Sequence, residues 1–394
     1  MSTAATQAAT LLEAARALAP RLVARADAAE EARSVPAETI ADLADARFFD
    51  MLKPARFGGL ECHPGVFFDV VAEVASACPS TGWVLGVVAA HAWQLALFPE
   101  AAQTDVWGAD RSALICSSYM PVGKLTPEPG GFRVSGRWGF SSGCDHCSWA
   151  MLGAMAPPAR EGAPPDMLTL LVPRSDLTID DDWFVAGLRA TGSKSVVLDG
   201  AFVPTHRTHR MSDAFRLDSP GNAVNPAPLY RLPFGQVFTR TVATPAIGML
   251  QGALDAFVAA NRGRASRADG KLPESDPAAQ EAVANAKLAL CEVRAVLHHD
   301  FDEMMGLAER GEPISLASRV GYRHHSASVT DRMVAAVDAL FVEAGSGAIF
   351  RSSRLQRFFQ DVHAARAHHA NNPRRAARNL GSTSFGHPTS DYFL

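Results

Sequence analysis

Hydrophobic residues recur at three- and four-residue intervals through the first hundred residues, a spacing that predicts amphipathic helices. Between residues 8 and 32 this apolar stripe consists of Leu11, Leu12, Ala15, Leu18, Leu22 and Val23. Val35-Pro36-Ala37-Glu38 is typical of the start of a second helix, with proline in its first turn. The most apolar stretch, residues 83–98, contains His91 and Gln94 and is too short to span a membrane, so it predicts a buried core helix.

The sequence pattern changes near residue 112, where short runs rich in β-forming residues are separated by glycine and proline. These runs predict a small antiparallel sheet or barrel. A crossing rich in proline and asparagine, residues 219–235, leads back to helices, one of which starts at Asp276-Pro277 and ends near Arg310. Periodic stretches near 314–345 and 352–370 extend a helical bundle that also suits a subunit interface.

The order of these elements predicts a mainly α protein with a central β-domain. The expected domains are N-terminal helices (1–111), a middle β-domain (112–230) and a C-terminal bundle (231–394). The net charge is −4 and no basic stripe is visible, so a nucleic acid partner is not expected. Six irregularly spaced cysteines, and an N-terminus unlike a signal peptide, indicate a soluble protein of the reducing cytoplasm.

The first segment with chemical potential runs from Gly136 to Trp149 and contains the turn Ser141-Ser142-Gly143. Hydroxyl groups and a glycine at the end of a strand allow a planar cofactor to approach closely, and Trp138 can stack on it. The same residues also suit an ordinary turn with serine hydrogen bonds. Cys144 and Cys147 form a C-x-x-C pair, but no further ligands or helix start lie nearby, so we expect no metal site.

Two other segments carry polar groups. Residues 187–199 form a loop rich in glycine and hydroxyl groups, but it has neither the P-loop pattern nor the dinucleotide-binding pattern. Residues 356–369 predict a helix on which Asp361 and His368 share one face, seven residues apart. A histidine there can act as a general base near neutral pH, whereas Arg366 would point away from His368 on a straight helix.

Taken together and in this order, these segments resemble the flavin-dependent monooxygenases built on the acyl-CoA dehydrogenase fold. The matching stretches are 80–83, 91–98, 117–119, 138–146, 187–193 and 357–372. Within that family the likeness is greatest to two-component hydroxylases of phenols, such as those acting on a phenolic seco-steroid or on 4-hydroxyphenylacetate. The resemblance implies helices, a middle β-barrel or sandwich and a C-terminal four-helix bundle, assembled as a homotetramer.

The resemblance also implies the chemistry. A separate NAD(P)H-dependent reductase would supply reduced flavin, FMNH₂ or FADH₂, whose hydroperoxide formed with O₂ hydroxylates a small aromatic, phenolic substrate. Ser142 would contact the flavin ring edge and protect the peroxide. The wall around the flavin would consist of Trp138 and Ser141, of Ser117 and Ser118 on the adjoining strand, and of Arg264 at a flavin phosphate.

The same resemblance assigns the substrate side of the site. His368 and His91 are the candidates for deprotonating a phenol, a step that raises the electron density of the ring. The expected substrate-binding residues are Trp83 and Trp93, which would wall a dry pocket, together with Tyr119 and Arg366. The residues leave open which histidine is the base and whether the flavin is FMN or FAD.

Three alternatives remain at this stage. A related oxygenase acting on nitrogen, sulfur or indole would need no phenol base. An acyl-CoA dehydrogenase is disfavoured because residues 345–363 depart from the glycine-rich turn and Arg-Asp-Ala-Arg pattern of those enzymes, and no glutamate base is evident. A non-catalytic scaffold that kept the fold would fail to bind reduced flavin.

Overall fold

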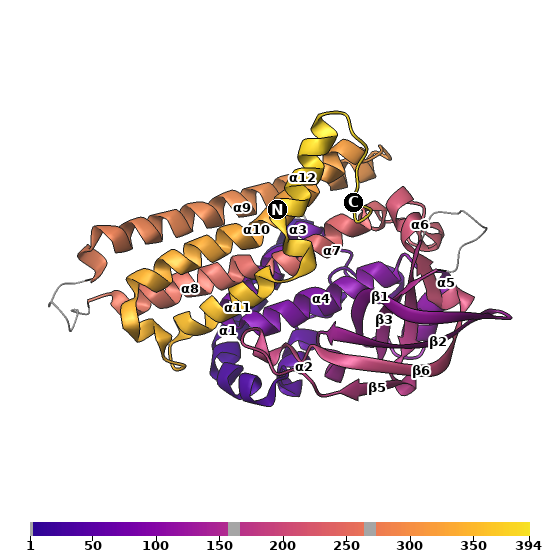
Figure 1. Ribbon diagram of the computed structural model, residues 1–394, viewed down its shortest axis with the longest axis horizontal. Helices are drawn as coiled ribbons and strands as arrows, with labels where there is room; N and C mark the ends of the chain where they lie inside the picture. The colour runs from indigo at the N-terminus through magenta and orange to yellow at the C-terminus, as the bar shows by residue number, and fades with distance from the viewer. Residues whose placement is uncertain (1–2, 157–165, 264–272) are drawn as a thin grey trace.

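The structure is a computed structural model that describes residues 3–156, 166–263 and 273–394. The chain begins with helices, most of which lie in the middle of the molecule, between the C-terminal helices and the sheet (Figure 1). Their bounds are α1 Thr3–Ala32, α2 Ala37–Asp45, α3 Pro64–Ala77, α4 Pro79–Leu95 and α5 Glu100–Trp107. Nearly every side chain of α4 is buried, from Pro79 to Leu95, which confirms the core helix expected from the apolar stretch that begins at Trp83.

A seven-stranded sheet follows, with strand order β5-β6-β2-β1-β3-β4-β7. The strands are β1 Ile115–Glu128, β2 Gly131–Ser141, β3 Trp149–Met155, β4 Met167–Pro173, β5 Leu177–Asp180, β6 Lys194–Pro204 and β7 Thr208–Arg210. The expectation of a wholly antiparallel sheet is wrong, because β1 and β3 pair in parallel. The chain reverses once after β1 and again after β2, so β3 returns along the free edge of β1 in the original direction.

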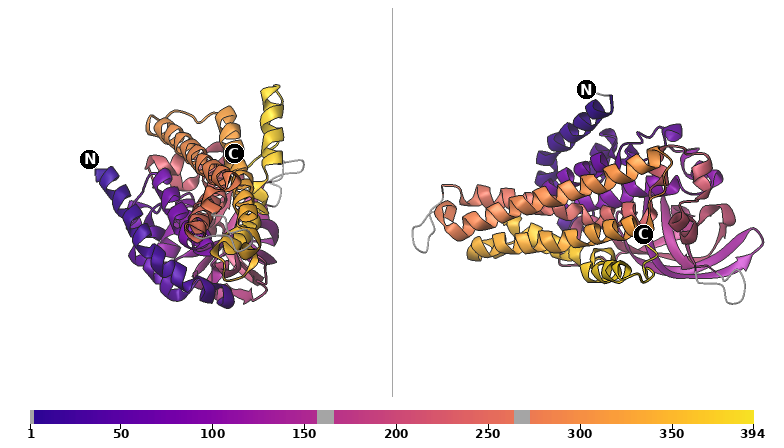
Figure 2. Two further views of the ribbon diagram at one scale, coloured as in Figure 1. Left: turned by 90° about the vertical axis from the view of Figure 1, so that its left-hand side faces the viewer. Right: turned by 90° about the horizontal axis from the view of Figure 1, so that it is seen from above.

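The rest of the chain is helical. The helices are α6 Met211–Arg216, α7 Phe234–Ala243, α8 Pro245–Asn261, α9 Pro277–Glu309, α10 Leu316–Glu343, α11 Arg354–Arg366 and α12 Pro373–Ser384. α8, α9, α10 and α11 pack side by side as the C-terminal bundle, and the right-hand view of Figure 2 shows them extending away from the sheet. This arrangement confirms the mainly α fold with a central β-domain.

Local sequence signals explain several helix ends. Asp276 accepts a hydrogen bond from the Ala278 amide and Pro277 occupies the first turn, so α9 starts where the sequence predicts. The helix expected over 352–370 ends earlier, at Arg366. There the side chain of Asn371 donates to the carbonyl of Ala365 at 2.8 Å, and Pro373 begins the next helix. His368 therefore lies in a turn and not on the face of a helix with Asp361.

The sheet and the bundle meet around α4 and α7. α4 packs against both β1 and α7. The stretch Phe234–Asn261, which includes α7 and α8, is apolar and long enough to cross a membrane, but 72% of its most apolar window is buried inside the molecule. That burial is characteristic of a core helix. The predicted domain boundaries at 111/112 and 230/231 fall in the connections before β1 and α7 and stay predictions.

Candidate active site

The turn after β2 brings two serines against α4. Phe140 has a left-handed backbone (φ 62°), and Ser142 donates its amide to the carbonyl of Phe140 at 3.0 Å. Gly143 is also left-handed (φ 71°), and a Cβ atom there would lie 3.0 Å from a methyl group of Val84. Glycine is therefore needed for the turn to approach α4 this closely.

The loop 187–193 is fastened to this turn and to α11. A Cβ atom on Gly187 would lie 2.3 Å from the carbonyl oxygen of Gln360, so only glycine lets the loop dock on the helix. The Leu188 amide donates to the carboxyl group of Asp361 at 2.5 Å, and the Gly143 amide donates to the carbonyl of Thr191 at 2.9 Å. The loop is thus held at both ends beside the serine turn.

A continuous row of hydrogen bonds joins the loop, the turn and α4. Trp83 Nε1 donates to Ser142 Oγ at 3.1 Å, and Ser142 Oγ lies 2.7 Å from Ser193 Oγ. Ser193 Oγ lies 2.6 Å from Thr191 Oγ1, which donates to the carbonyl of Leu188 at 2.9 Å. Ser142 thus has fixed partners on both sides, which define how its hydroxyl group is oriented.

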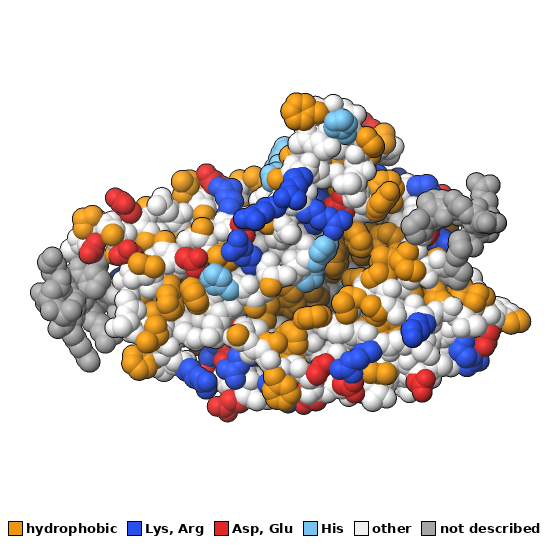
Figure 3. All heavy atoms as spheres, viewed as in Figure 1, with side chains coloured by type: hydrophobic (Ala, Val, Ile, Leu, Met, Phe, Trp, Pro, Cys, Tyr) orange, Lys and Arg blue, Asp and Glu red, His pale blue; other side chains and the backbone are white. Residues whose placement is uncertain are grey.

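Aromatic rings connect Ser142 with both candidate histidines. The His368 ring lies 5.9 Å from that of Trp83 and 6.1 Å from that of Phe238. Phe238 meets Tyr119 edge to face at 5.2 Å, and Tyr119 meets His91 at 6.1 Å. We call these five residues the aromatic wall. Figure 3 shows hydrophobic side chains around a hollow where, in Figure 1, α4 and α7 face β1.

The two histidines carry their protons on different ring nitrogens. His91 Nδ1 lies 2.6 Å from the carbonyl of Ile115, which only accepts, so Nδ1 holds the proton and Nε2 keeps a lone pair. His368 Nδ1 accepts from the Ala370 amide at 3.2 Å, so the neutral ring holds its proton on Nε2. Burial lowers the pKa of each ring to about 4, and both are therefore neutral near pH 7.

Trp138 does not offer a ring face to a cofactor. It is completely buried and donates from Nε1 to the carbonyl of Gly153 at 2.8 Å. The expected stacking role is therefore wrong. Phe140 is instead 68% exposed and meets Trp183 edge to face at 5.9 Å. The left-handed backbone at Phe140 interrupts the alternation of the strand and turns this ring outward.

The remaining aromatic and serine candidates lie at different depths. Trp93 is buried behind the aromatic wall, where it donates to the carbonyl of Leu229 at 2.7 Å and stacks on Phe234. Ser117 shares the face of β1 that carries Tyr119, and Ser118 points to the opposite face. Their side chains therefore point to opposite faces of β1, and the expected role of both at one flavin stays a prediction. Tyr119 also donates to Gln94 of α4.

Neither of the two arginine candidates is found in this site among the residues that the structure describes. Arg366 is exposed at the end of α11 and forms an ion pair with Asp331 on α10. Its position agrees with the expectation that it points away from His368. Arg264 lies outside the described residues, so its expected role at a flavin phosphate stays a prediction.

The polar groups of the site suit a planar heterocycle with a polar edge. Ser141 Oγ is fully buried and has no hydrogen-bond partner within residues 3–156, 166–263 and 273–394. The hydroxyl of Ser142 and the exposed ring of Phe140 offer groups that a flavin would use, whereas the expected role of the enclosed Ser141 at the flavin stays a prediction. No cluster of three metal-ligating side chains occurs in the described part of the chain, and burial raises the pKa of the Cys144 thiol to about 12.

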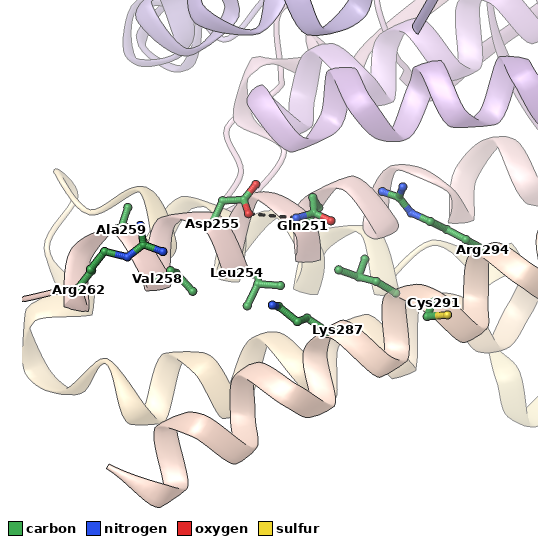
Figure 4. Close-up of a pocket in the computed structure, with 10 residues that line it drawn as sticks. Gln251, Leu254, Asp255, Val258, Ala259, Arg262, Lys287, Cys291 and Arg294 are labelled. Carbon is green, nitrogen blue, oxygen red and sulfur yellow. Dashed lines mark hydrogen bonds between the residues drawn. The ribbon is translucent and has the colours of Figure 1, made fainter. Parts of the chain in front are cut away.

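Two other hollows lie away from the aromatic wall. A groove of about 720 Å³ lies between α8 and α9, and Figure 4 shows Asp255 and Arg262 on the side of α8 and Lys287 and Arg294 on α9. A hollow of about 540 Å³ beside α12 is lined by polar and basic side chains that include Arg374, Arg375 and Arg378. Of the described site residues predicted from the sequence, none lines either hollow.

Sequence reasoning missed several residues of this site. Phe238 lies on α7 and belongs to none of the motifs that the sequence analysis identified. Thr191 and Ser193 lie in the glycine-rich loop that the sequence analysis identified, but the contact of Ser193 with Ser142 joins residues 51 positions apart. Asp361 was expected on the face of His368, and it instead anchors Leu188.

Comparison with known proteins agrees with this geometry. Residues 5–110 match the acyl-CoA dehydrogenase N-terminal domain, and residues 240–373 match the acyl-CoA dehydrogenase C-terminal domain. The chain is 40% identical over 377 residues to the flavin-dependent monooxygenase oxygenase subunit HsaA of Rhodococcus jostii, covering 95% of this chain and 98% of the relative. It is 35% identical over 371 residues to the oxygenase component of an FADH₂-dependent resorcinol hydroxylase from Rhizobium, covering 91% and 89%.

Solved structures give the same result. The HsaA monooxygenase of Mycobacterium tuberculosis superposes with a TM-score of 0.92 at 38% identity, covering 98% of this chain and 100% of that one. The 3-HSA hydroxylase of Rhodococcus sp. RHA1 gives a TM-score of 0.91 at 38% identity, covering 98% and 99%. The chain therefore belongs to the flavin-dependent monooxygenases built on the acyl-CoA dehydrogenase fold, as an oxygenase component that uses reduced flavin and O₂.

Proposed function

We propose that this protein hydroxylates a small phenolic substrate held against the aromatic wall. The observation that carries the proposal is the opposite protonation of the two buried histidines. His91 presents a lone pair on Nε2 and His368 presents an N–H group on Nε2. A site that hydroxylates phenols needs both a proton acceptor for the phenol and a donor for the oxygen that is transferred.

His91 is the proposed acceptor of the phenol proton. Its Nε2 is the basic nitrogen because Nδ1 is committed to Ile115. A pKa of about 4 makes the free imidazole a weak base, but a phenolate beside it favours the charged ring and raises that pKa. The resulting ion pair lies in an environment with little water, where opposite charges attract strongly.

His368 is the proposed hydrogen-bond donor, and Ser142 the proposed contact of the flavin edge. Bound reduced flavin supplies the activation of O₂, and the chain supplies position, dryness and proton control. Trp83 ties these two parts together, because its ring packs against His368 while its Nε1 donates to Ser142. Phe238 and Tyr119 complete an apolar surface that suits an aromatic ring and excludes water.

The partners follow from the same family. The relatives are described as an oxygenase subunit and an oxygenase component, which supports a separate NAD(P)H-dependent reductase as the source of reduced flavin. Exposed hydrophobic side chains on the bundle, such as Leu288 of α9 and Val342 of α10, support assembly as a homotetramer. The buried, unpaired cysteines other than Cys291 suit a reducing cytoplasm. The choice between FMN and FAD is part of the test.

The test begins with anaerobic titration of the purified protein with reduced FMN and with reduced FAD. The complex is then mixed with oxygenated buffer and a panel of phenols, and products are identified by mass spectrometry. Binding of reduced flavin and O₂-dependent formation of a catechol are the expected results. Bleaching of a bound oxidised flavin by an acyl-CoA identifies a dehydrogenase instead, and failure to bind any flavin identifies a scaffold.

A further inference from the structure

We infer that Thr191 and Ser193 fix Ser142 as a hydrogen-bond acceptor toward the cofactor, and that this makes the site select reduced over oxidised flavin. The inference rests on the proposed contact of Ser142 with the flavin edge. Thr191 is almost completely buried and its hydroxyl group contacts other protein groups, so it acts as a positioning residue through Ser193 and Ser142.

The direction of each hydrogen bond in the row from Leu188 to Ser142 follows from the number of protons that its members carry. The Leu188 carbonyl can only accept, so the hydroxyl proton of Thr191 is directed to it. Ser193 must then donate to Thr191, and Ser142 must donate to Ser193. Trp83 Nε1 is a donor only and occupies one lone pair of Ser142 Oγ. Ser142 is left with a lone pair, and no proton, for a further partner.

The reverse order is chemically allowed but makes fewer bonds. If Thr191 donated to Ser193 and Ser193 to Ser142, the proton of Ser142 would point to the cofactor side. The bond from Thr191 to Leu188 would then be lost. The Leu188 carbonyl would keep its bonds from Trp183 Nε1 and the Thr191 amide, both at 3.2 Å. The inferred order therefore gains one hydrogen bond within the protein over the reverse.

The two redox states of flavin differ at the nitrogen between the rings, N5. In reduced flavin N5 carries a proton and donates, whereas in oxidised flavin N5 has a lone pair and accepts. An acceptor at Ser142 pairs with the first and opposes the second. An enzyme that receives reduced flavin from another protein gains from this choice, because oxidised flavin then leaves and does not block the site.

The experiment compares Thr191→Val with Thr191→Ser. Valine has nearly the shape of threonine but no hydroxyl group, so Ser193 can donate only to Ser142, and the proton of Ser142 turns toward the cofactor. We expect the ratio of dissociation constants, oxidised over reduced, to fall roughly three- to tenfold, the value of about one hydrogen bond. Thr191→Ser keeps the hydroxyl group and should keep the ratio of the wild type.

Both constants are measured by anaerobic titration with FMN and FAD, and thermal unfolding checks that the variants fold. The midpoint potential of bound flavin gives a second readout, since a tenfold change in the ratio equals about 30 mV for a two-electron couple. Ser193→Ala should change the ratio in the same direction. An unchanged ratio in Thr191→Val and Ser193→Ala, or an equal fall in Thr191→Ser, overturns the inference. Failure of the wild type to bind either redox state overturns the proposed function instead.

Discussion

The aromatic wall contains two histidines, His91 at one end and His368 beside Trp83 at the other, which are buried alike yet prepared for opposite tasks. At one end His91 donates to a carbonyl of the neighbouring strand, and at the other His368 accepts from an amide of its own turn. Burial lowers both pKa values to about 4. The difference in chemistry therefore comes from the backbone partner and not from the pKa.

The two anchors also differ in range. His91 on α4 is oriented by Ile115, the first residue of β1, so its tautomer depends on how the helix packs on the sheet. His368 is oriented by Ala370, two residues along the chain, so its tautomer depends on a local turn. Substitutions that keep the hydrogen bond of one ring nitrogen and remove that of the other can test the two histidines separately.

The largest effect is expected at the acceptor end. In His91→Asn the amide group can still donate to Ile115, but nothing replaces the Nε2 lone pair. Turnover of a phenol should fall by about 10²–10⁴ near pH 7, the usual contribution of a general base. The loss should shrink as the pH approaches the pKa of a phenol, about 10, because the substrate then ionises unaided. The measurement is the pH profile of product formation.

That profile also separates the alternatives of the same fold. If His91→Asn turns over a phenol as fast as the wild type at every pH, His91 takes no part in the mechanism. If the wild-type protein turns over indole or a sulfide but no phenol, it is the N-, S- or indole oxygenase and not a phenol hydroxylase.

A smaller effect is expected at the donor end. His368→Asn can still accept from the Ala370 amide but lacks the Nε2 proton, whereas His368→Gln places an N–H group near the position of Nε2. Loss of one preorganised donor costs roughly 10²-fold in turnover. We expect that loss for the asparagine variant without recovery at high pH, and a milder loss for glutamine. Single-turnover kinetics with pre-bound reduced flavin give the comparison, and equal losses in both variants would contradict a donor role.

The sequence predicted the elements that depend on local signals. The start of α9 at Asp276-Pro277 and the burial of α4 both follow from neighbouring residues. The early end of α11 at Arg366 had no such signal, because Pro373 restricts only Asn372, and the predicted helix already stopped before that residue. No local signal showed that Phe140, and not Trp138, has the exposed ring. This difference follows from the left-handed backbone at Phe140, where the turn meets α4.

The site itself was predicted as a set of segments, but not as a set of contacts. Ser142, Trp83, His91, His368 and Tyr119 were all named from the family resemblance, and the structure joins them through ring contacts and hydrogen bonds. Their tautomers and hydroxyl directions depend on partners far away in the chain. Periodicity and spacing carry no information on such partners, so these properties required coordinates.

A third prediction concerns Asp361, seven residues before His368, and the pH dependence of protein stability. Burial raises the pKa of Asp361 to about 7, well above the value of an unfolded aspartate. The folded state therefore holds a proton that the unfolded state releases above about pH 4, and stability falls as the pH rises from about 4 to 7. Asp361→Asn still accepts from Leu188 and cannot ionise, so this fall, on the order of 3–4 kcal/mol, should disappear.

Denaturant unfolding of both proteins between pH 4 and pH 8 measures the effect. The wild type should lose stability across this range relative to the variant, and the two should be most alike at the acidic end. Parallel curves would mean that Asp361 is ionised in the folded protein, and that the loop 187–193 is held by a carboxylate.

The smallest effect is expected for Arg366, which the sequence placed at the substrate and the structure places on the surface. Its side chain is about half exposed and paired with Asp331 across α10 and α11, and such pairs contribute about 0–1 kcal/mol. Arg366→Ala and Asp331→Ala should therefore change unfolding free energy and KM for a phenol by similarly small amounts. A large rise in KM in Arg366→Ala alone would mean that the turn carrying His368 rearranges when substrate binds. The local anchor at Ala370 would then be the weaker of the two, because a turn held within itself moves at less cost than a helix packed on a sheet.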